Sequence, residues 1–254
     1  MHIVDRSRGA GGLVHLLRRT PSVKQSWQLR WKPVCASTEI ELTNWLKQNP
    51  LKGSIPRAFL AARQNHGTGQ QGREWHSPVG GVWISAAFPM SQSPKSPGLL
   101  GLAVAVSIAQ RLERFKIPVQ IKWPNDLLVG GRKLAGFLPR LIHRGETLRL
   151  GRIGLGLNVC NNVPRGAISL AEILEPRNCT QRFWSVEVIH ALDRAIELIE
   201  DGDYVCFEAE RILWSRIINN PLTGEKFIIE GLNSKGALKL RQGAHKIIWN
   251  RWPL

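Results

Sequence analysis

Apolar and polar residues alternate along residues 119–123, and this period of two is typical of a β-strand with one buried face. Val119, Ile121 and Trp123 would lie together on the buried face. Lys122 would then project from the opposite face. A strand lysine is most often an exposed surface residue, so the pattern alone gives Lys122 no chemical role.

A turn and a hairpin are predicted directly after this strand. Pro124 favours an extended backbone at the residue before it, so we expect the strand to continue to Trp123, and residues 125–126 suit a turn. Gly130 and Gly131 then separate two further strand-like segments. This pattern predicts a two-residue β-hairpin.

The remaining apolar pattern predicts further helices and strands. The strongest helix covers residues 99–115, and its apolar part would pack on the sheet. Other predicted elements are strands at 58–62, 80–88 and 148–159, a helix that begins near residue 39, and helices at 169–174 and 186–199. Short strands at 225–230, 236–240 and 246–249 predict a small all-β module at the C-terminal end, which we expect to be a barrel.

Composition places the chain among globular proteins. It has 254 residues, of which 43% are hydrophobic and 21% are charged, and no apolar run approaches the roughly 20 residues of a membrane span. The four cysteines are scattered, with no close pair of the metal-ligand type. We therefore expect mostly buried free thiols in a reducing compartment, with the cytoplasm as the location.

The charge of +16 is concentrated at the two ends of the chain. Residues 1–33 hold seven Lys or Arg and one Asp, and residues 211–254 hold eight Lys or Arg and two Glu. We interpret residues 1–33 as a flexible basic arm, although their Arg-rich composition also fits an organelle transit peptide. A basic surface attracts phosphates, nucleotides, acidic proteins and nucleic acid alike, so it indicates a class of partner and not a function.

Two hydroxyl residues precede the helix near residue 39. Ser37 or Thr38 could cap it, and Glu41 has the spacing that a capping box starting at Thr38 would need. A structural cap is the simplest interpretation of both hydroxyls. A hydroxyl at a helix start can also donate or accept hydrogen bonds with a ligand.

Two glycine-rich segments are candidates for ligand binding. The loop at 64–75 holds three glycines within six residues, so its backbone N–H groups could approach phosphates, although it matches neither the phosphate-loop motif nor the dinucleotide fingerprint. It could equally be a mobile surface loop or a lid over a ligand. In the strand at 148–159, Gly154 and Gly156 leave one face without side chains, which either relieves packing or lets a flat ligand lie against the backbone.

Together these segments resemble the biotin protein ligase family from about Ser37 to the C-terminus, and the order and spacing of the motifs carry the resemblance. The motifs are Ser37-Thr38, Gln64 before the glycine loop, Gly72-Arg73-Glu74-Trp75-His76-Ser77-Pro78, Lys122-Trp123-Pro124-Asn125-Asp126, Arg132-Lys133-Leu134-Ala135-Gly136 and Gly154-Leu155-Gly156-Leu157-Asn158. The resemblance implies an α+β fold, in which a mixed sheet flanked by helices forms a class II synthetase-like catalytic domain and is followed by a small C-terminal SH3-like β-barrel. Gly231 to Leu240 is similar to part of that barrel.

The resemblance implies a two-step acyl transfer. Biotin and ATP would form biotinyl-5'-AMP with Mg²⁺ shielding the triphosphate, and the biotinyl group would pass to a lysine of a biotin carboxyl carrier domain of acetyl-CoA carboxylase. By motif position Lys122 would be the catalytic residue, since a fixed cation stabilises the charge that gathers at the transferring phosphorus.

The resemblance also implies a set of binding residues. Biotin would be held by Ser37, Thr38, Gln64, Gly67, Thr68, Gly69, Lys122, Gly136, Gly154 and Gly156. ATP and the adenylate would be held by Gln70, Arg73, Trp75, Lys122 and Asn158, with Trp75 stacked on the adenine and Asn158 at its edge.

One departure from the family pattern lies in the glycine loop. The family commonly carries arginines at the positions of Thr68 and Gln70, so two cations that would contact the adenylate are absent. Hydrogen bonds from charged donors are roughly twice as strong as neutral ones, and Arg73 would cover part of the loss. We therefore expect weaker retention of the adenylate.

The expected organisation is a basic arm at 1–33, a catalytic domain at 34–210 and the SH3-like domain at 211–254. With so few residues before Ser37, the chain resembles the short ligases that have no DNA-binding winged helix, so specific DNA binding is not expected. A homodimer is left open, and no membrane contact is expected.

Two other functions remain open. A lipoate or octanoate ligase or transferase shares the architecture, although the Lys122 motif argues against it. A non-catalytic relative could instead bind nucleic acid or an acidic partner through its basic flanks.

Overall fold

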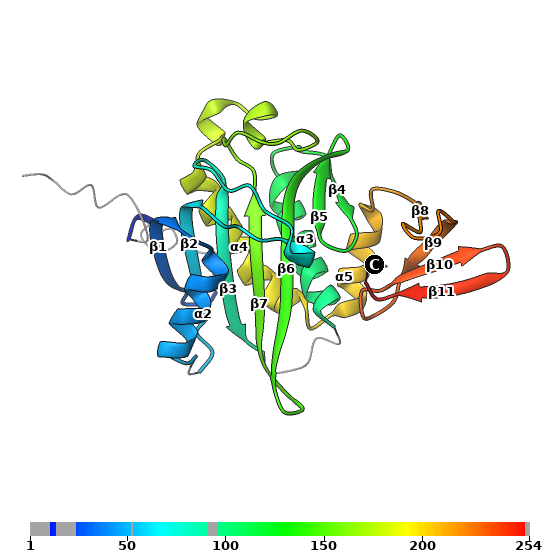
Figure 1. Ribbon diagram of the computed structural model, residues 1–254, viewed down its shortest axis with the longest axis horizontal. Coiled ribbons are helices and arrows are strands. Elements are labelled where there is room, and N and C mark those ends of the chain that lie inside the picture. The colour runs from blue at the N-terminus through cyan, green and yellow to red at the C-terminus, as the bar shows by residue number, and fades with distance from the viewer. Residues whose placement is uncertain (1–10, 14–23, 52, 91–95, 252–254) are drawn as a thin grey trace, which may run out of the picture.

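A seven-stranded mixed sheet forms the centre of the protein in the computed structural model, which describes residues 11–13, 24–51, 53–90 and 96–251 (Figure 1). In sheet order the strands are β1 Gln28–Cys35, β2 Arg57–Gln64, β3 Val82–Pro89, β7 Thr147–Leu157, β6 Arg132–Arg144, β5 Asp126–Val129 and β4 Val119–Lys122. β1 and β2 are parallel, and every other neighbouring pair is antiparallel.

Helices cover both faces of this sheet. They are α2 Thr38–Gln48, α3 Pro97–Glu113, α4 Gln181–Leu198 and α5 Gly202–Arg211, with 3-10 turns at Gln70–Gly72, Leu170–Glu172 and Pro176–Asn178. α2 lies on one face, and α3 and α4 pack on the other (Figure 1). Alternation along β2 explains the two layers, because Ala58 and Leu60 join the large core under α3 whereas Phe59 packs with Leu42 and Trp45 of α2.

The predicted centre of the chain is largely confirmed. Val119, Ile121 and Trp123 are buried and Lys122 is exposed, but β4 ends at Lys122, so the expected continuation to Trp123 is wrong. Trp123 instead lies in the turn before β5. The hairpin at Gly130-Gly131 joins β5 to β6, and both glycines have positive φ, as a two-residue turn of this kind requires.

Helix α3 confirms the strongest helical pattern. Ser96 caps it by accepting a hydrogen bond from the Leu99 N–H, and Pro97 occupies the first turn, where its missing N–H costs nothing. Nearly every residue from Leu99 to Leu112 is buried, because the helix lies between the sheet and helices α4 and α5. Helix α4 begins at Gln181, five residues before the predicted start.

The basic-arm assignment was wrong for residues 28–33, which form most of strand β1. The Asp193 carboxylate of α4 holds the segment before this strand, since it accepts hydrogen bonds from the N–H groups of Lys24 and Gln25 and from the Trp27 indole. Much of the predicted arm, residues 1–10 and 14–23, lies outside the described residues. The contact with Asp193 comes from a distant part of the chain, so no local sequence pattern indicates where this strand begins.

Three smaller differences concern short elements. The helix predicted at 169–174 is only the 3-10 turn at Leu170–Glu172, and α5 and the short strand β8 Ile217–Asn219 were not predicted.

Among the described residues no helix is long and apolar enough to cross a membrane. The connection predicted at 91–98 falls mostly on residues 91–95, which lie outside the described residues.

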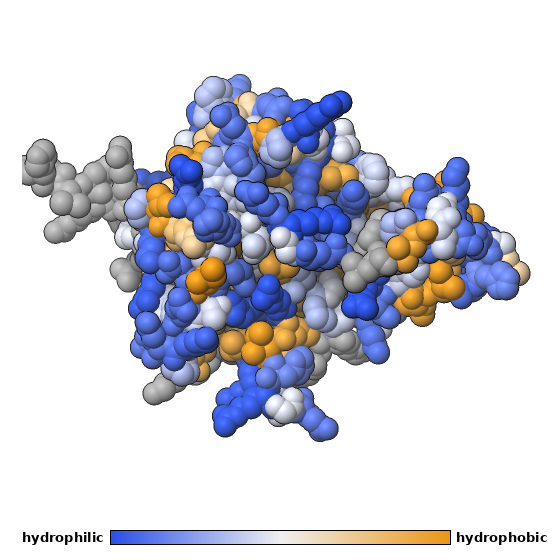
Figure 2. Space-filling view, viewed as in Figure 1, coloured by the Kyte–Doolittle hydropathy of each residue, from blue (hydrophilic) through white to orange (hydrophobic). Residues whose placement is uncertain are grey.

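The C-terminal strands form the small all-β module as a four-stranded antiparallel sheet. Besides β8, its strands are β9 Lys226–Leu232, β10 Leu238–Gln242 and β11 His245–Trp249, in the order β11-β10-β9-β8. It is tied to the main sheet because the buried Trp123 indole donates a hydrogen bond to the Gly236 carbonyl. Apolar surface is visible over this sheet in Figure 2, and its exposed apolar residues include Ile217, Ile228 and Ile248.

The cysteines confirm the expectation of mostly buried free thiols. Cys35, Cys179 and Cys206 are buried, Cys160 is exposed, and none is in a disulfide. Burial raises the pKa of the Cys35 and Cys206 thiols to about 11, so neither has the thiolate character of a reactive cysteine.

Candidate functional site

A cavity of about 200 Å³ lies on the face of the main sheet that carries α2. The start of α2 and the loop that follows β2 form its rim, and strands β5, β6 and β7 form its floor. The lining residues that the sequence predicted are Ser37, Thr38, Gln64, Thr68, Gly69, Gln70, Arg73, Trp75, Gly136, Gly154 and Gly156. The fold thus brings together segments that are more than 100 positions apart in the chain.

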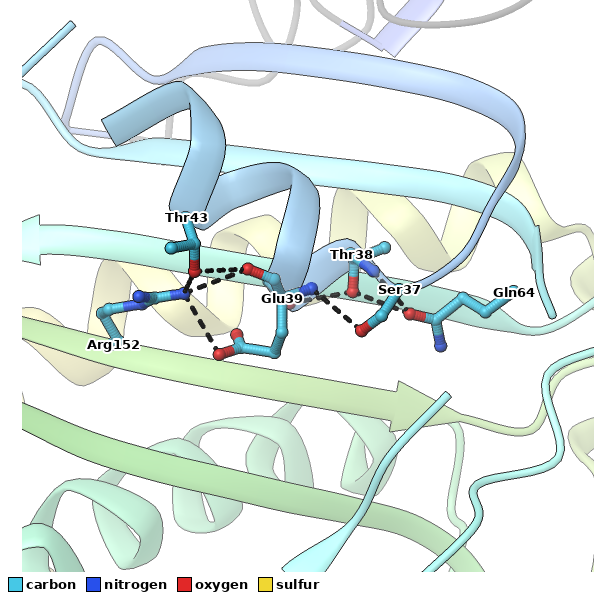
Figure 3. Close-up of polar contacts among 7 residues, drawn as sticks. Ser37, Thr38, Glu39, Thr43, Gln64 and Arg152 are labelled. Carbon is cyan, nitrogen blue, oxygen red and sulfur yellow. Dashed lines mark hydrogen bonds and ion pairs between the residues drawn. The ribbon is translucent and has the colours of Figure 1, made fainter. Parts of the chain in front are cut away.

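A chain of hydrogen bonds runs along the rim (Figure 3). The Ser37 hydroxyl caps α2 by accepting from the Glu39 N–H, so Ser37 and not Thr38 is the cap. The Thr38 N–H and hydroxyl both donate to Oε1 of Gln64. On its other side, the amide group of Gln64 donates to the Ser77 hydroxyl.

Gly67 holds the loop together and does not line the cavity. A Cβ at this position would lie 2.5 Å from both the Ser77 hydroxyl and the Trp75 carbonyl, closer than any side chain could come. The Gly67 carbonyl also accepts a hydrogen bond from the Trp75 N–H. Only glycine fits at position 67, where one part of the loop lies directly against another part.

The Trp75 indole packs against the bare backbone of two glycines. Gly136 of β6 and Gly156 of β7 are directly paired across the strands, and a Cβ on either would collide with the indole ring, at 2.8 Å and 2.4 Å. The indole N–H is buried without a hydrogen-bond partner among the described residues. The glycines therefore admit a flat aromatic group against the sheet, and in this structure that group is Trp75 itself.

Two cations line the cavity. Lys133 makes an ion pair of 2.8 Å with Asp126, and its Nζ lies 4.8 Å from the centroid of the Trp75 ring. Arg73 is exposed and donates to the Gln71 side chain. The sequence prediction did not include Lys133 as a site residue, and its position in the Arg132-Lys133-Leu134-Ala135-Gly136 motif is the signal that could have indicated it.

Lys122 is not part of the lining. Its Nζ lies 5.6 Å from the centroid of the Trp214 ring, in a neighbouring groove that also includes Ile121 and Leu213. Lys122 is nevertheless paired with Asp126 across β4 and β5, and directly opposite residues project from the same face of a sheet. The Lys122 ammonium group therefore belongs to β4, the strand next to β5, and it lies over Trp214 and not in the cavity.

Asn158 also lies outside this cavity, in an adjoining one that Trp75, Lys133 and His76 help to line. Its amide N–H donates to the Lys133 carbonyl, and its Oδ1 accepts from Asn161. The side chain is buried and held in one orientation by these contacts. The adjoining cavity shares Glu74, Trp75 and Lys133 with the first one.

A buried ion pair at the cavity wall was missed by the sequence analysis. Glu39 of α2 pairs with Arg152 of β7 at 3.1 Å, and the two side chains are only 13% and 10% exposed. Arg152 also donates to the Glu39 carbonyl and to the Thr43 hydroxyl (Figure 3). The signal that could have revealed it was Arg152, which directly precedes the apolar end of strand β7, residues 153–157.

The fold is that of the biotin protein ligases. The ligase of Aquifex aeolicus in complex with biotin and ATP superimposes with a TM-score of 0.69 over 89% of this chain and 96% of that chain, at 21% identity. The Helicobacter pylori biotin acetyl coenzyme A carboxylase synthetase gives 0.62 over 89% and 100%, at 22% identity. The α+β fold predicted from the sequence is confirmed.

The sequence itself matches the Biotin/lipoate A/B protein ligase family over residues 34–158. The bifunctional ligase/repressor BirA of Escherichia coli is 30% identical over 199 residues, which are 73% of this chain and 61% of that protein. The biotin–[acetyl-CoA-carboxylase] ligase of Paracoccus denitrificans is 30% identical over 112 residues, 43% of this chain and 47% of that protein. Residues 34–158 match this family, and the chain spans about three fifths of the length of BirA.

Proposed function

We propose that this protein is a biotin protein ligase, which makes biotinyl-5'-AMP from biotin and ATP and transfers the biotinyl group to a lysine of a carrier domain. One observation carries the proposal. A single cavity joins a rim of hydroxyl and amide groups to a glycine floor, and the segments that form it belong to the region that matches the family. Neutral polar groups suit the uncharged ureido ring, and bare backbone suits a flat ligand.

In the first step an oxygen of the biotin carboxylate attacks the α-phosphorus of ATP, and the bond to the bridging oxygen breaks to release pyrophosphate. Lys122 stabilises the charge on the carboxylate and the α-phosphate, for which its flexible side chain turns from Trp214 towards the cavity. Lys133 and Arg73 add positive charge at the cavity. In the second step the amine of the carrier lysine attacks the anhydride carbonyl and releases AMP.

Ligand binding on the glycine floor requires a movement of Trp75. The indole now covers Gly136 and Gly156, so a flat ligand such as biotin and the indole cannot occupy this floor together. In the proposed complex Trp75 moves off the glycines and stacks on the adenine, which lies towards Asn158 in the adjoining cavity. Thr68, Gly69 and Gln70 close the loop over the ligand, with Thr68 and Gln70 contributing neutral contacts only.

Mg²⁺ would enter this site with the nucleotide. The described residues contain no group of three or more His, Cys, Asp or Glu side chains that could hold a metal ion by themselves. Mg²⁺ commonly binds through substrate phosphates with only one or two carboxylates, so Glu74 and Asp126 at the cavity are sufficient. The ion would shield the charge of the triphosphate.

The carrier that we propose is the biotin carboxyl carrier domain of acetyl-CoA carboxylase. The name of the Paracoccus denitrificans relative supports this choice. The four free thiols support a reducing compartment such as the cytoplasm.

The test is biotin-dependent exchange of labelled pyrophosphate into ATP, with octanoate and lipoate as alternative acids. The parent should exchange with biotin, and Lys122→Ala should lose most of the activity. Lys226→Ala, on the C-terminal sheet away from the cavity, is the matched control and should exchange like the parent. Exchange with octanoate or lipoate but not with biotin, or none with any acid, would refute the proposal.

A further inference from the structure

Lys122 rests against Trp214, outside the cavity in which the proposed reaction needs its charge. Its Nζ lies 5.6 Å from the centroid of the Trp214 ring, which is within the range of a cation–π contact. The Asp126 carboxylate, which lies opposite Lys122 across β4 and β5, is paired with Lys133 instead. The contact with the Trp214 ring therefore places the Lys122 ammonium group in this structure.

The backbone of β4 holds Trp214 beside Lys122. The Trp214 N–H donates to the Ile121 carbonyl at 2.9 Å, and the Ile121 N–H donates to the Ile212 carbonyl at 2.7 Å. These bonds form a parallel bridge between Ile121 and Leu213 along β4, the last strand of the main sheet. Because main-chain groups make both bonds, the position of residue 214 does not depend on its side chain.

The indole is placed to meet a cation and adds little to the core. Trp214 is 45% exposed, although tryptophan is a large apolar residue. It lines a groove between the main sheet and the C-terminal sheet, together with Lys122, Leu213 and Ile217. A ring that stays nearly half exposed gains little from burial, but its face can still attract an ammonium group.

The charge of the cavity favours this resting position as long as no ligand is bound. Lys133 and Arg73 already line the cavity, so a third cation would be repelled there. A biotin carboxylate and a triphosphate reverse this balance, because they bring several negative charges. Lys122 then exchanges a weak contact with a ring for a strong contact with anionic oxygens.

We propose that Trp214 is a positioning residue of the ligase reaction, which holds the Lys122 ammonium group out of the empty cavity and releases it to the bound carboxylate and α-phosphate. This inference rests on the proposed function. A cation–π contact at an exposed site favours one position of an ammonium group by about 2- to 5-fold. Trp214 therefore weakens the apparent affinity for the ligands by the same factor, since binding must first release Lys122.

The kinetic experiment compares Trp214→Leu and Trp214→Phe with the parent in pyrophosphate exchange. Trp214→Leu removes the ring, so the Michaelis constants for ATP and biotin should fall by about 2- to 5-fold. The maximal rate should not change, because Lys122 lies in the loaded cavity in both proteins. Trp214→Phe keeps a smaller ring and should give intermediate constants. Ile217→Ala is the matched control, since it trims the same groove without touching the ring, and its constants should equal those of the parent.

The position of Lys122 is measured separately by NMR of the lysine Cε–Hε groups, with Lys122→Arg to assign the signal. In the ligand-free parent the indole ring should shift the Lys122 signal upfield. The shift should vanish in Trp214→Leu, and in the parent it should vanish when biotin and a non-hydrolysable ATP analogue are added. This measurement needs no turnover, so it tests the contact independently of the activity.

The remaining outcomes are distinguishable. Unchanged Michaelis constants or a lower maximal rate in a folded Trp214→Leu overturn the inference and leave the proposed function intact, and so does a ligand-free parent without the upfield shift. If thermal melting shows that Trp214→Leu does not fold, Trp214→Phe and the response of the parent signal to ligands decide in its place. A parent without biotin-dependent exchange refutes the proposed function, and the role of Trp214 in the reaction falls with it.

Discussion

Replacing Gly156 by alanine should force Trp75 off the sheet. The backbone of Gly156 does not have positive φ, so alanine suits the strand and only the steric clash matters. The new Cβ would lie 2.4 Å from the indole nitrogen and 2.5 Å and 2.7 Å from two ring carbons. These contacts are far inside van der Waals distance, and the ring also lies over Gly136, the residue paired with Gly156 on the neighbouring strand.

The expected cost combines two terms of opposite sign. Overpacking of a well-filled site costs about 1–3 kcal/mol. Loss of glycine from the unfolded chain returns about 0.4–1 kcal/mol. The net loss of unfolding free energy should therefore be on the order of 1–2 kcal/mol, with the indole displaced towards solvent.

Urea unfolding measures the free energy, and the Trp75 contribution to fluorescence is obtained by difference from Trp75→Phe. The emission of Trp75 should shift to the red in Gly156→Ala. The matched control is Gly154→Ala on the same strand, whose Cβ would meet Leu138 at an ordinary 3.4 Å. If Gly156→Ala were as stable as Gly154→Ala and the Trp75 emission did not change, the indole would not lie on these glycines.

Three further predictions concern other parts of the molecule. Asp193→Ala leaves three donors without their acceptor, so it should lower the unfolding free energy by about 1.5–3 kcal/mol and speed hydrogen exchange in β1 Gln28–Cys35. Burial, with Arg111 adding to it, lowers the pKa of His190 below its usual 6.5, so protons favour the unfolded state and stability should fall as pH drops below about 6.5. His190→Gln should flatten that part of the stability curve. Gln70→Arg should slow release of the adenylate in a filter-binding assay, because it adds a charged donor to the loop.

The sequence by itself determined the local elements at the centre of the protein. Two glycines between strand-like segments suffice for the hairpin of β5 and β6, since a two-residue turn needs positive φ at both positions. A long apolar stretch with a serine and a proline before it suffices for α3. The order of short motifs also sufficed to identify the family.

Only the tertiary structure decided the positions of the long charged side chains of Lys122 and Glu39. Alternation places Lys122 on the exposed face of β4, but the side chain turns to Trp214, which lies 92 positions further along the chain. Glu39 has the sequence position of an ordinary first-turn residue of α2, and only the fold pairs one of its carboxylate oxygens with Arg152, 113 positions away. Strand β1 depends in the same way on Asp193. Backbone geometry follows from neighbours in sequence, whereas the direction and pairing of a long polar side chain depend on which distant segments pack beside it.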